Sequence, residues 1–343
     1  MNRSIIAIVL VCLWLTGCND RQTLKTSFTT YLTRVASVFD TAPPELSQPP
    51  ALPPLPAQRT LQLSQPRVSA GLLDTLKLGE CRLLTLVGEH NSPVGKSQQA
   101  GAVFMYHLQF QQGLNNCLSR SNDKALRSWL TDLQQQKAPL LPGFYWNMMV
   151  AEPEIRAALT PRQRPVMPDH RGFQATYNAF SLFAALQLLS QAPASTPDVN
   201  SDEFSERLSG LYNNDYLGEL YYSLHSASHY LHQSLLFLSR LEQFNCGPAG
   251  KEDARRLRNA MEHYYIKDIQ AQLTELDRHF VRLAPLLEQS LIPPPARQAE
   301  VAEYRHWYAS GLNSHIYRRY RQLTLDHAKA WQRFLHRCDL PPS

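Results

Sequence analysis

The chain has 343 residues, in which 34 Lys and Arg residues stand against 29 Asp and Glu residues, giving a formal net charge of +5. This excess is small for the length, so the charge does not indicate a nucleic-acid partner, and we predict none. Residues 66–343 are numerous enough to bury a large hydrophobic core.

The first 17 residues have the pattern of an export signal. Arg3 supplies one positive charge, and an apolar run of eleven residues extends from Ile5 to Leu15. A membrane-spanning helix needs about 20 apolar residues, so this run is too short to be one, and its length is typical of a signal peptide. We therefore predict that residues 1–17 are a cleaved signal peptide and that the mature chain is exported.

The end of this run, Leu15-Thr16-Gly17-Cys18, resembles the lipobox of bacterial lipoproteins. The resemblance implies a diacylglycerol on the Cys18 thiol and an acylated amino terminus, so that fatty acids such as palmitate anchor the chain to a membrane. The alternative is an ordinary cleaved signal with an incidental cysteine. In lipoproteins an aspartate directly after the cysteine indicates retention in the inner membrane, and this chain has Asn19 there. We therefore expect the periplasmic face of the outer membrane, with the inner membrane as the alternative.

Two segments separate the anchor from the main body. In the segment 18–40, apolar residues on one side predict a short amphipathic helix over residues 22–39. The segment 41–65 contains seven prolines between residues 41 and 58, a density that excludes a helix and favours an extended conformation. We interpret it as a semi-rigid spacer or as a strap laid over the domain, and a PxxP ligand is the third interpretation.

Residues 66–343 predict one helical domain, because their apolar spacing is helical and no alternating strand pattern occurs. Three long apolar patterns joined by short loops predict neighbouring antiparallel helices over residues 202–245, 252–288 and 296–337. Pro285 predicts a bend or an end in the second helix, and residues 311–313 predict a break in the third. The predicted fold class is an all-α antiparallel multi-helix bundle with a Pro-rich N-terminal spacer after a lipidated cysteine.

The cysteines predict two disulfide bonds. Once Cys12 has left with the signal peptide and Cys18 is lipidated, an even number remains in an oxidising compartment: Cys81, Cys117, Cys246 and Cys338. Cys246 follows the first long helix and Cys338 follows the third, so an up-down-up arrangement brings both to one end of the bundle. We predict the pairs Cys246–Cys338 and, by elimination, Cys81–Cys117.

One group of residues has metal-ligand spacing. Neither G-x-S-x-G nor H-E-x-x-H occurs in the chain. His225, His229 and His232 stand at i, i+4 and i+7, so they share one helical face, where imidazoles bind zinc or copper. The alternative is a polar helix flank in which each imidazole bonds to a neighbouring hydroxyl or carbonyl group. Apart from this metal, the sequence predicts no cofactor.

Two polar segments are candidate recognition surfaces, and their residues are Asn91, Ser92 and Lys96 in the first and Trp146 and Asn147 in the second. The first lies between two apolar helical runs. The second is expected in a loop, where aromatic residues bind partners. The alternative for the second is that its aromatic residues cover a helical core while the asparagine bonds to the backbone.

Two small basic clusters lie on helical patterns. The first comprises Arg255, Arg256 and Arg258, and the second comprises Arg318, Arg319 and Arg321. We interpret both as solvated helix faces, with contact to anionic lipid head groups as the alternative.

Several short motifs together resemble an uncharacterised family of proteobacterial lipoproteins that is catalogued only as a domain of unknown function. They are the lipobox, Cys81-Arg82-Leu83, Asn91-Ser92, Gly95-Lys96, Cys117, Phe244-Asn245-Cys246, Trp331-Gln332-Arg333-Phe334 and Cys338. The resemblance covers most of the mature chain and implies no activity, substrate or cofactor.

The sequence predicts a membrane-anchored periplasmic lipoprotein that acts as a non-enzymatic scaffold, accessory or assembly factor in the cell envelope. Its predicted partners are the membrane, through the lipid on Cys18, and an envelope protein. One alternative is a metal- or small-ligand-binding lipoprotein that uses His225, His229 and His232. The other is an envelope hydrolase with its site near Asn91-Ser92 or Glu154, although Glu154 is equally placed to be a charge at a helix start.

Overall fold

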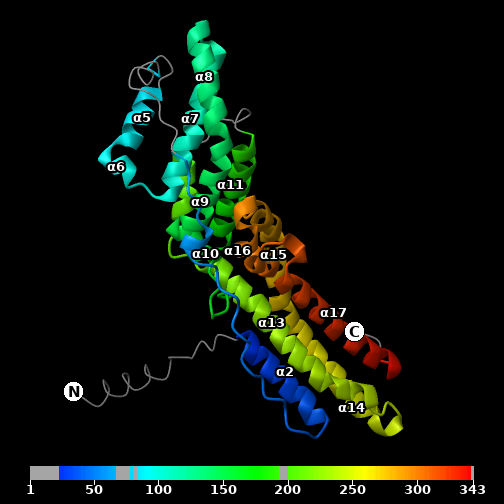
Figure 1. Ribbon diagram of the computed structural model, residues 1–343. Helices are drawn as coiled ribbons and strands as arrows, with labels where there is room; N and C mark the ends of the chain where they lie inside the picture. The colour runs from blue at the N-terminus through cyan, green and yellow to red at the C-terminus, as the bar shows by residue number, and fades with distance from the viewer. Residues whose placement is uncertain (1–22, 67–77, 80–82, 193–199, 341–343) are drawn as a thin grey trace, which may run out of the picture. The chain divides into compact units, whose positions relative to one another are not determined.

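The computed structural model describes residues 23–66, 78–79, 83–192 and 200–340, and within these ranges the chain forms helices joined by loops, with no strand (Figure 1). The prediction of an all-α fold is therefore confirmed. None of the helices in the described ranges is long and apolar enough to cross a membrane. Residues 1–17, Cys18 and Cys81, which carry the predicted signal, anchor and one disulfide, lie outside the described ranges.

The α-helices are, in chain order, α2 (Leu24–Val38), α3 (Gln58–Leu61), α5 (Leu83–Asn91), α6 (Pro93–Lys96), α7 (Ala100–Arg120), α8 (Lys124–Lys137), α9 (Leu141–Ala151), α10 (Pro153–Leu159), α11 (Phe173–Gln191), α12 (Ser201–Ser209), α13 (Tyr216–Leu238), α14 (Lys251–Ala260), α15 (Ala271–Ser290), α16 (Gln298–Tyr308) and α17 (His315–Arg337). Single turns of 3₁₀-helix occur at Ala138–Leu140, Ser239–Gln243, Pro248–Gly250, Pro295–Arg297 and Gly311–Asn313, and a π-helical segment spans Met261–Gln270. The turn at Gly311–Asn313 is the predicted break in the third long helix.

The described residues fall into two compact units. The first unit contains the residues up to 47 together with 233–272 and those from 329 onward. Its core includes the predicted amphipathic helix, since α2 buries Phe28, Tyr31 and Val35 completely. The indole Nε1 of Trp331 donates a hydrogen bond of 2.7 Å to the Tyr31 hydroxyl. This polar bond inside an aromatic core fixes how the first helix packs against the last one.

A disulfide bond between Cys246 and Cys338 closes the first unit, with their α-carbons 4.9 Å apart. It joins the segment that follows α13 to the residue that follows α17. The predicted pairing is therefore confirmed, and so is the reason for it, because both helices end at the same place. Cys117 is also disulfide-bonded.

The second unit contains residues 48–232 and 273–328 within the described ranges. In it, α17 runs antiparallel to α15, because the Tyr317 ring stacks on Phe280 while the Tyr320 hydroxyl, one turn later, donates to the Leu273 carbonyl, two turns earlier. The predicted antiparallel packing holds for this pair. The α15 helix continues past Pro285 to its end at Ser290, so the proline does not end it.

The centre of the second unit is a buried tyrosine. The Tyr145 hydroxyl on α9 is shared between the carbonyl oxygens of Phe183, at 2.9 Å, and Ser290, at 3.0 Å. It thereby joins α9, α11 and the end of α15. Because Tyr145 is 2% exposed, its hydroxyl needs protein partners, and these two carbonyls supply them.

Candidate functional site

The first predicted recognition segment forms the junction of two short helices. Asn91 is the exposed last residue of α5, and Lys96 is the last residue of α6. The Ser92 hydroxyl accepts a hydrogen bond of 3.0 Å from the Gly95 amide and donates one of 2.7 Å to the Glu89 carbonyl. Ser92 is therefore an N-cap for α6, and its hydroxyl is engaged in local structure.

The second predicted recognition segment lies inside α9, so the prediction that it is a loop is wrong. Trp146 is 1% exposed, and its Nε1 donates a 2.8 Å hydrogen bond to the Leu61 carbonyl. The Asn147 side chain makes two bonds of 2.8 Å, accepting from the Leu63 amide and donating to the Leu63 carbonyl. The alternative that we weighed, with aromatics on a helical core and an asparagine on the backbone, describes the segment correctly.

Leu61 and Leu63 belong to the segment 48–66, which is extended apart from the single helical turn α3 and which we call the strap. Side chains of several helices donate to its carbonyl oxygens. Tyr308 donates to Pro53 at 2.9 Å, Arg156 to Pro56 at 2.9 Å, and Arg297 to Gln62 at 3.0 Å. Prolines have no amide hydrogen to donate, so a Pro-rich segment is held mainly through its carbonyl oxygens. This part of the Pro-rich segment is a strap on the second unit, which was one of the interpretations of the sequence.

The three predicted metal-ligating histidines do not act together. His225 is buried and its Nε2 lies 3.0 Å from the Pro50 carbonyl, so this nitrogen carries a proton and donates to the strap. His229 is half-buried and His232 is exposed. Across the described ranges, no group of three or more His, Cys, Asp or Glu side chains is arranged to hold a metal ion.

The structure instead places His225 in a cluster that the sequence did not reveal. Its ring lies 6.1 Å from that of Trp307 on α16, which in turn lies 4.3 Å from the ring of His315 at the start of α17. His306 is next, with its ring 5.7 Å from His315. We call His225, His306, Trp307 and His315 the histidine–tryptophan cluster. The sequence offered one indirect sign of this cluster. His306-Trp307 and His315 lie on either side of the predicted break at residues 311–313, where a turn can bring them together.

The surroundings of His225 and His315 favour their neutral imidazoles. Burial lowers the pKa of His225, and the nearby His229, Arg319 and His315 lower it further, while the Pro50 carbonyl acts in the opposite direction. The pKa of His315 is lowered by burial first, and then by His306, Arg319 and Arg318. Arg319 thus lies close enough to both imidazoles to disfavour their protonation.

A second polar cluster lies where α13 begins against α15. The Tyr216 hydroxyl is 2.6 Å from His279 Nδ1 and 3.2 Å from His170 Nδ1. His170 has a left-handed backbone with φ of +48°, and Gly172 follows with φ of +94°. Burial lowers the pKa of His279 to about 4 and raises that of Tyr216. The Tyr216 hydroxyl therefore bridges the loop before α11 and α15 through the two imidazoles.

The acidic residues at the start of α10 also have structural contacts. Glu152 is 2% exposed, and its Oε2 accepts a 2.6 Å hydrogen bond from the Gly101 amide at the start of α7. Burial raises the pKa of Glu152, and the Gly101 amide partly offsets this effect. A carboxylate at this position stabilises the positive end of α7. Glu154 lies in the first turn of α10, as the helix-start interpretation predicts.

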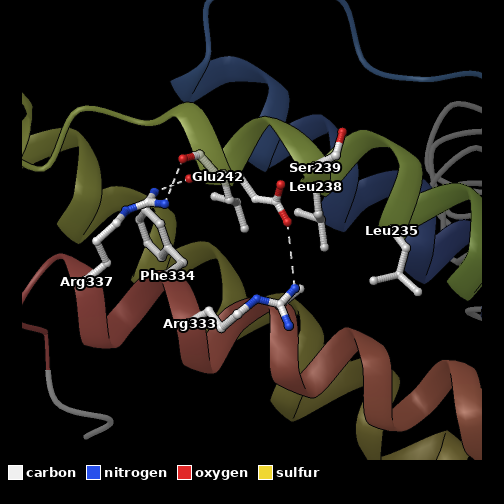
Figure 2. A pocket seen from close by; sticks show the side chains of 9 residues that line it. Leu235, Leu238, Ser239, Glu242, Arg333, Phe334 and Arg337 are labelled. Carbon is white, nitrogen blue, oxygen red and sulfur yellow. Dashed lines mark hydrogen bonds and ion pairs between the residues drawn. The ribbon is translucent and has the colours of Figure 1, made fainter.

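The first unit contains an open groove of about 480 Å³ (Figure 2). Leucines from the end of α13, together with Phe334 of α17, form its apolar wall. Arg337 donates to the carbonyls of Leu241 and Glu242, and Arg333 lies 3.8 Å from the Glu242 carboxylate. The guanidinium of Arg337 therefore binds the carbonyl groups of the segment that leads to the disulfide. We assign the groove a structural role, because the residues that line it hold this segment against α17.

Comparison with known proteins agrees with the resemblance in the sequence. No curated protein and no solved structure matches the chain significantly. One family model, described as "Protein of unknown function (DUF3080)", matches residues 28–342, which include both units and the strap. The chain therefore belongs to the DUF3080 family of proteins of unknown function.

Proposed function

We propose that this protein is a lipid-anchored protein of the bacterial cell envelope that acts as a scaffold, accessory or assembly factor rather than as an enzyme. The lipobox at Cys18 supports the anchor, and the expected location is the periplasmic face of the outer membrane. The predicted envelope partner binds the helical body, while the lipid holds the chain at the membrane.

The observation that carries the proposal is the strap. Its carbonyl oxygens receive hydrogen bonds from α9, α10, α13 and α16, so the Pro-rich segment is part of the folded body. If the helical body had to reach partners far from the membrane, a Pro-rich segment of this kind would serve as a free linker. Fixing it instead favours a function in which the body presents its surface to neighbours at the membrane.

The chemistry of the candidate catalytic residues supports a non-enzymatic role. Ser92, a candidate for the hydrolase site, caps a helix, and His225, the first of the candidate metal ligands, binds the strap. Each of these groups has its reactive atom engaged by the protein backbone. A nucleophile or general base needs that atom directed at a substrate.

The anchor is tested by labelling cells with a palmitate analogue. Wild-type protein should incorporate the label and fractionate with the outer membrane, whereas Cys18→Ser should remain unlabelled and retain residues 1–17. Cys12→Ser is the matched control, because Cys12 lies in the apolar run and should leave labelling unchanged. Normal labelling of Cys18→Ser would remove the basis of the proposal.

A further inference from the structure

The two basic clusters that look alike in the sequence differ in the structure. On α14, Arg255 lies 3.4 Å from Glu252, and Arg256 lies 3.4 Å from Asp253. Those two arginines are thus neutralised by acids one turn earlier on the same helix. The sequence interpretation of a solvated, internally paired helix face fits this cluster.

The arginine pair Arg318 and Arg319 on α17 has no such compensation. Both side chains are exposed, and within the described part of the chain neither makes an ion pair or a hydrogen bond. Only the third member of that cluster, Arg321, has an acidic neighbour, Asp277 at 3.5 Å. Within the described ranges, these two adjacent cations therefore have no acidic partner.

The position of Arg318 and Arg319 near the start of α17 is also electrostatically unfavourable. The first turn of α17 contains no acidic residue, and His315, Arg318 and Arg319 all lie within its first five residues. The N-terminal end of a helix carries a partial positive charge and favours anions, so cations placed there repel it. Residues whose placement is electrostatically unfavourable in the fold often mark functional positions. Here an external anion would stabilise the cations at the start of α17.

Apolar groups adjoin these charges. Leu312 lies in the turn that leads from α16 to α17 and is 46% exposed, although it is a large aliphatic residue. Trp307 is half-buried beside His315, and His306 is exposed. Tryptophan and aliphatic side chains next to arginine are the combination found where a protein meets the head-group layer of a membrane.

We propose that His306, Trp307, Leu312, His315, Arg318 and Arg319 form a contact surface for anionic phospholipid head groups. The unpaired cations match the lipid phosphates in charge, and Trp307 and Leu312 match the boundary between head groups and acyl chains. The proposal rests on the proposed function, which places the chain at a membrane. It adds that the folded body contacts the lipid surface through α16 and α17, in addition to the acyl anchor.

The test uses the full chain carrying Cys18→Ser, so that no acyl chain contributes, and vesicles of phosphatidylethanolamine mixed with either phosphatidylglycerol or phosphatidylcholine. Residues 1–17 remain in every sample, so the apolar run gives the same background throughout. We expect Arg318→Gln/Arg319→Gln to lower binding to phosphatidylglycerol vesicles by about tenfold or more, because each arginine near an anionic surface contributes substantially. Binding to phosphatidylcholine vesicles should not change.

The matched control is Arg255→Gln/Arg256→Gln, which removes the same charge from another pair of adjacent exposed arginines. It should alter phosphatidylglycerol binding by less than about twofold, because those arginines already have acidic partners. Leu312→Ser should weaken binding to phosphatidylglycerol vesicles without changing the net charge. Helical circular dichroism and the melting temperature confirm that each variant is folded.

Equal losses from the two arginine pairs, or unchanged binding after Arg318→Gln/Arg319→Gln, would overturn the proposed surface. Neither result bears on the anchor, which is read separately by palmitate labelling of Cys18.

Discussion

The indole nitrogen of Trp146 donates a hydrogen bond of 2.8 Å to the carbonyl oxygen of Leu61, 85 residues earlier in the chain. With the two bonds between Asn147 and Leu63, this contact fastens the strap to the middle of a buried helix. Two residues that the sequence singled out for recognition thus hold the Pro-rich segment in place. The same pattern recurs at Pro50, Pro53 and Pro56, so the strap is secured along its length.

Asn147→Ala should destabilise the protein by about 1 to 3 kcal/mol, because it leaves the partly buried amide and carbonyl of Leu63 without partners. Urea unfolding measures the change, and limited proteolysis should reveal earlier cleavage within residues 48–66. Asn116→Ala, on an exposed position of α7, should unfold at the wild-type midpoint. A strap equally resistant to proteolysis in Asn147→Ala would show that these bonds do not hold it.

Replacing histidines on α13 should show whether their main role is to stabilise the fold or to bind a metal. His225→Ala should cost about 1 to 2 kcal/mol, because the Pro50 carbonyl loses its donor. His232→Ala, on an exposed turn of the same helix, should change the free energy of unfolding by less than about 0.5 kcal/mol.

The metal hypothesis is checked on the same variants. Zinc or copper should shift the melting temperature of wild type, His225→Ala and His232→Ala equally, because His225 Nε2 is bonded to the strap. A stabilisation by either metal that disappears in both variants would instead establish the histidine face as a metal site.

The Cys246–Cys338 bond should make a measurable contribution to stability. It spans 92 residues of sequence. A loop of this length corresponds to about 4.6 kcal/mol in the chain-entropy model, and Cys246→Ser/Cys338→Ser should lose up to this amount in urea unfolding. Non-reducing peptide mapping should yield a peptide that joins Cys246 to Cys338.

The same peptide map tests the second pair. We expect Cys117 to be joined to Cys81, and a peptide that joins Cys81 to Cys246 or Cys338 would contradict both pairings.

His279 should give the protein an acid-sensitive component of stability. Burial is the main cause that lowers its pKa to about 4 in the fold, and the neighbouring His170 and Arg278 act in the same direction, whereas Glu275 opposes them. The unfolded chain binds a proton near pH 6.5, so the contribution is complete above that pH and disappears as the pH falls through about 4. Its size is about 3 kcal/mol.

The measurement is urea unfolding between pH 7.5 and pH 4.5. His279→Gln should show a smaller loss of stability than wild type over this range, because its side chain does not titrate. Some loss should persist, since His327 and His107 have pKa values lowered to about 3 by burial. His336→Gln, at an exposed position, should follow the wild-type curve. Parallel curves for wild type and His279→Gln would exclude this origin of acid sensitivity.

The sequence alone predicted the features that depend on local spacing. Steps of three and four between apolar residues predicted the helical segments over 252–288 and 296–337, and the break at residues 311–313 followed from its glycine and asparagine. The single helix predicted over residues 202–245 was wrong, because α12 ends at Ser209 and α13 spans only Tyr216–Leu238, and apolar spacing alone did not reveal the loop between them. The Cys246–Cys338 pair was predictable because both cysteines lie beyond the ends of helical patterns that bring them to the same end of the bundle. The π-helical segment Met261–Gln270 was missed, since a shift from one hydrogen-bond register to another leaves the apolar seam nearly unchanged.

Only the tertiary structure decided what the polar side chains do. Whether Trp146 contacts a partner or the chain's own backbone depends on where residues 48–66 run, and a run of prolines specifies extension but no direction. The arginines of α14 have acidic partners one turn earlier on the same helix, whereas only the folded chain shows that Arg318 and Arg319 have no acidic partner within the described ranges. Periodicity fixes which face of a helix is buried, whereas the partners of Trp146, Asn147 and His225 are fixed by a segment far away in the chain.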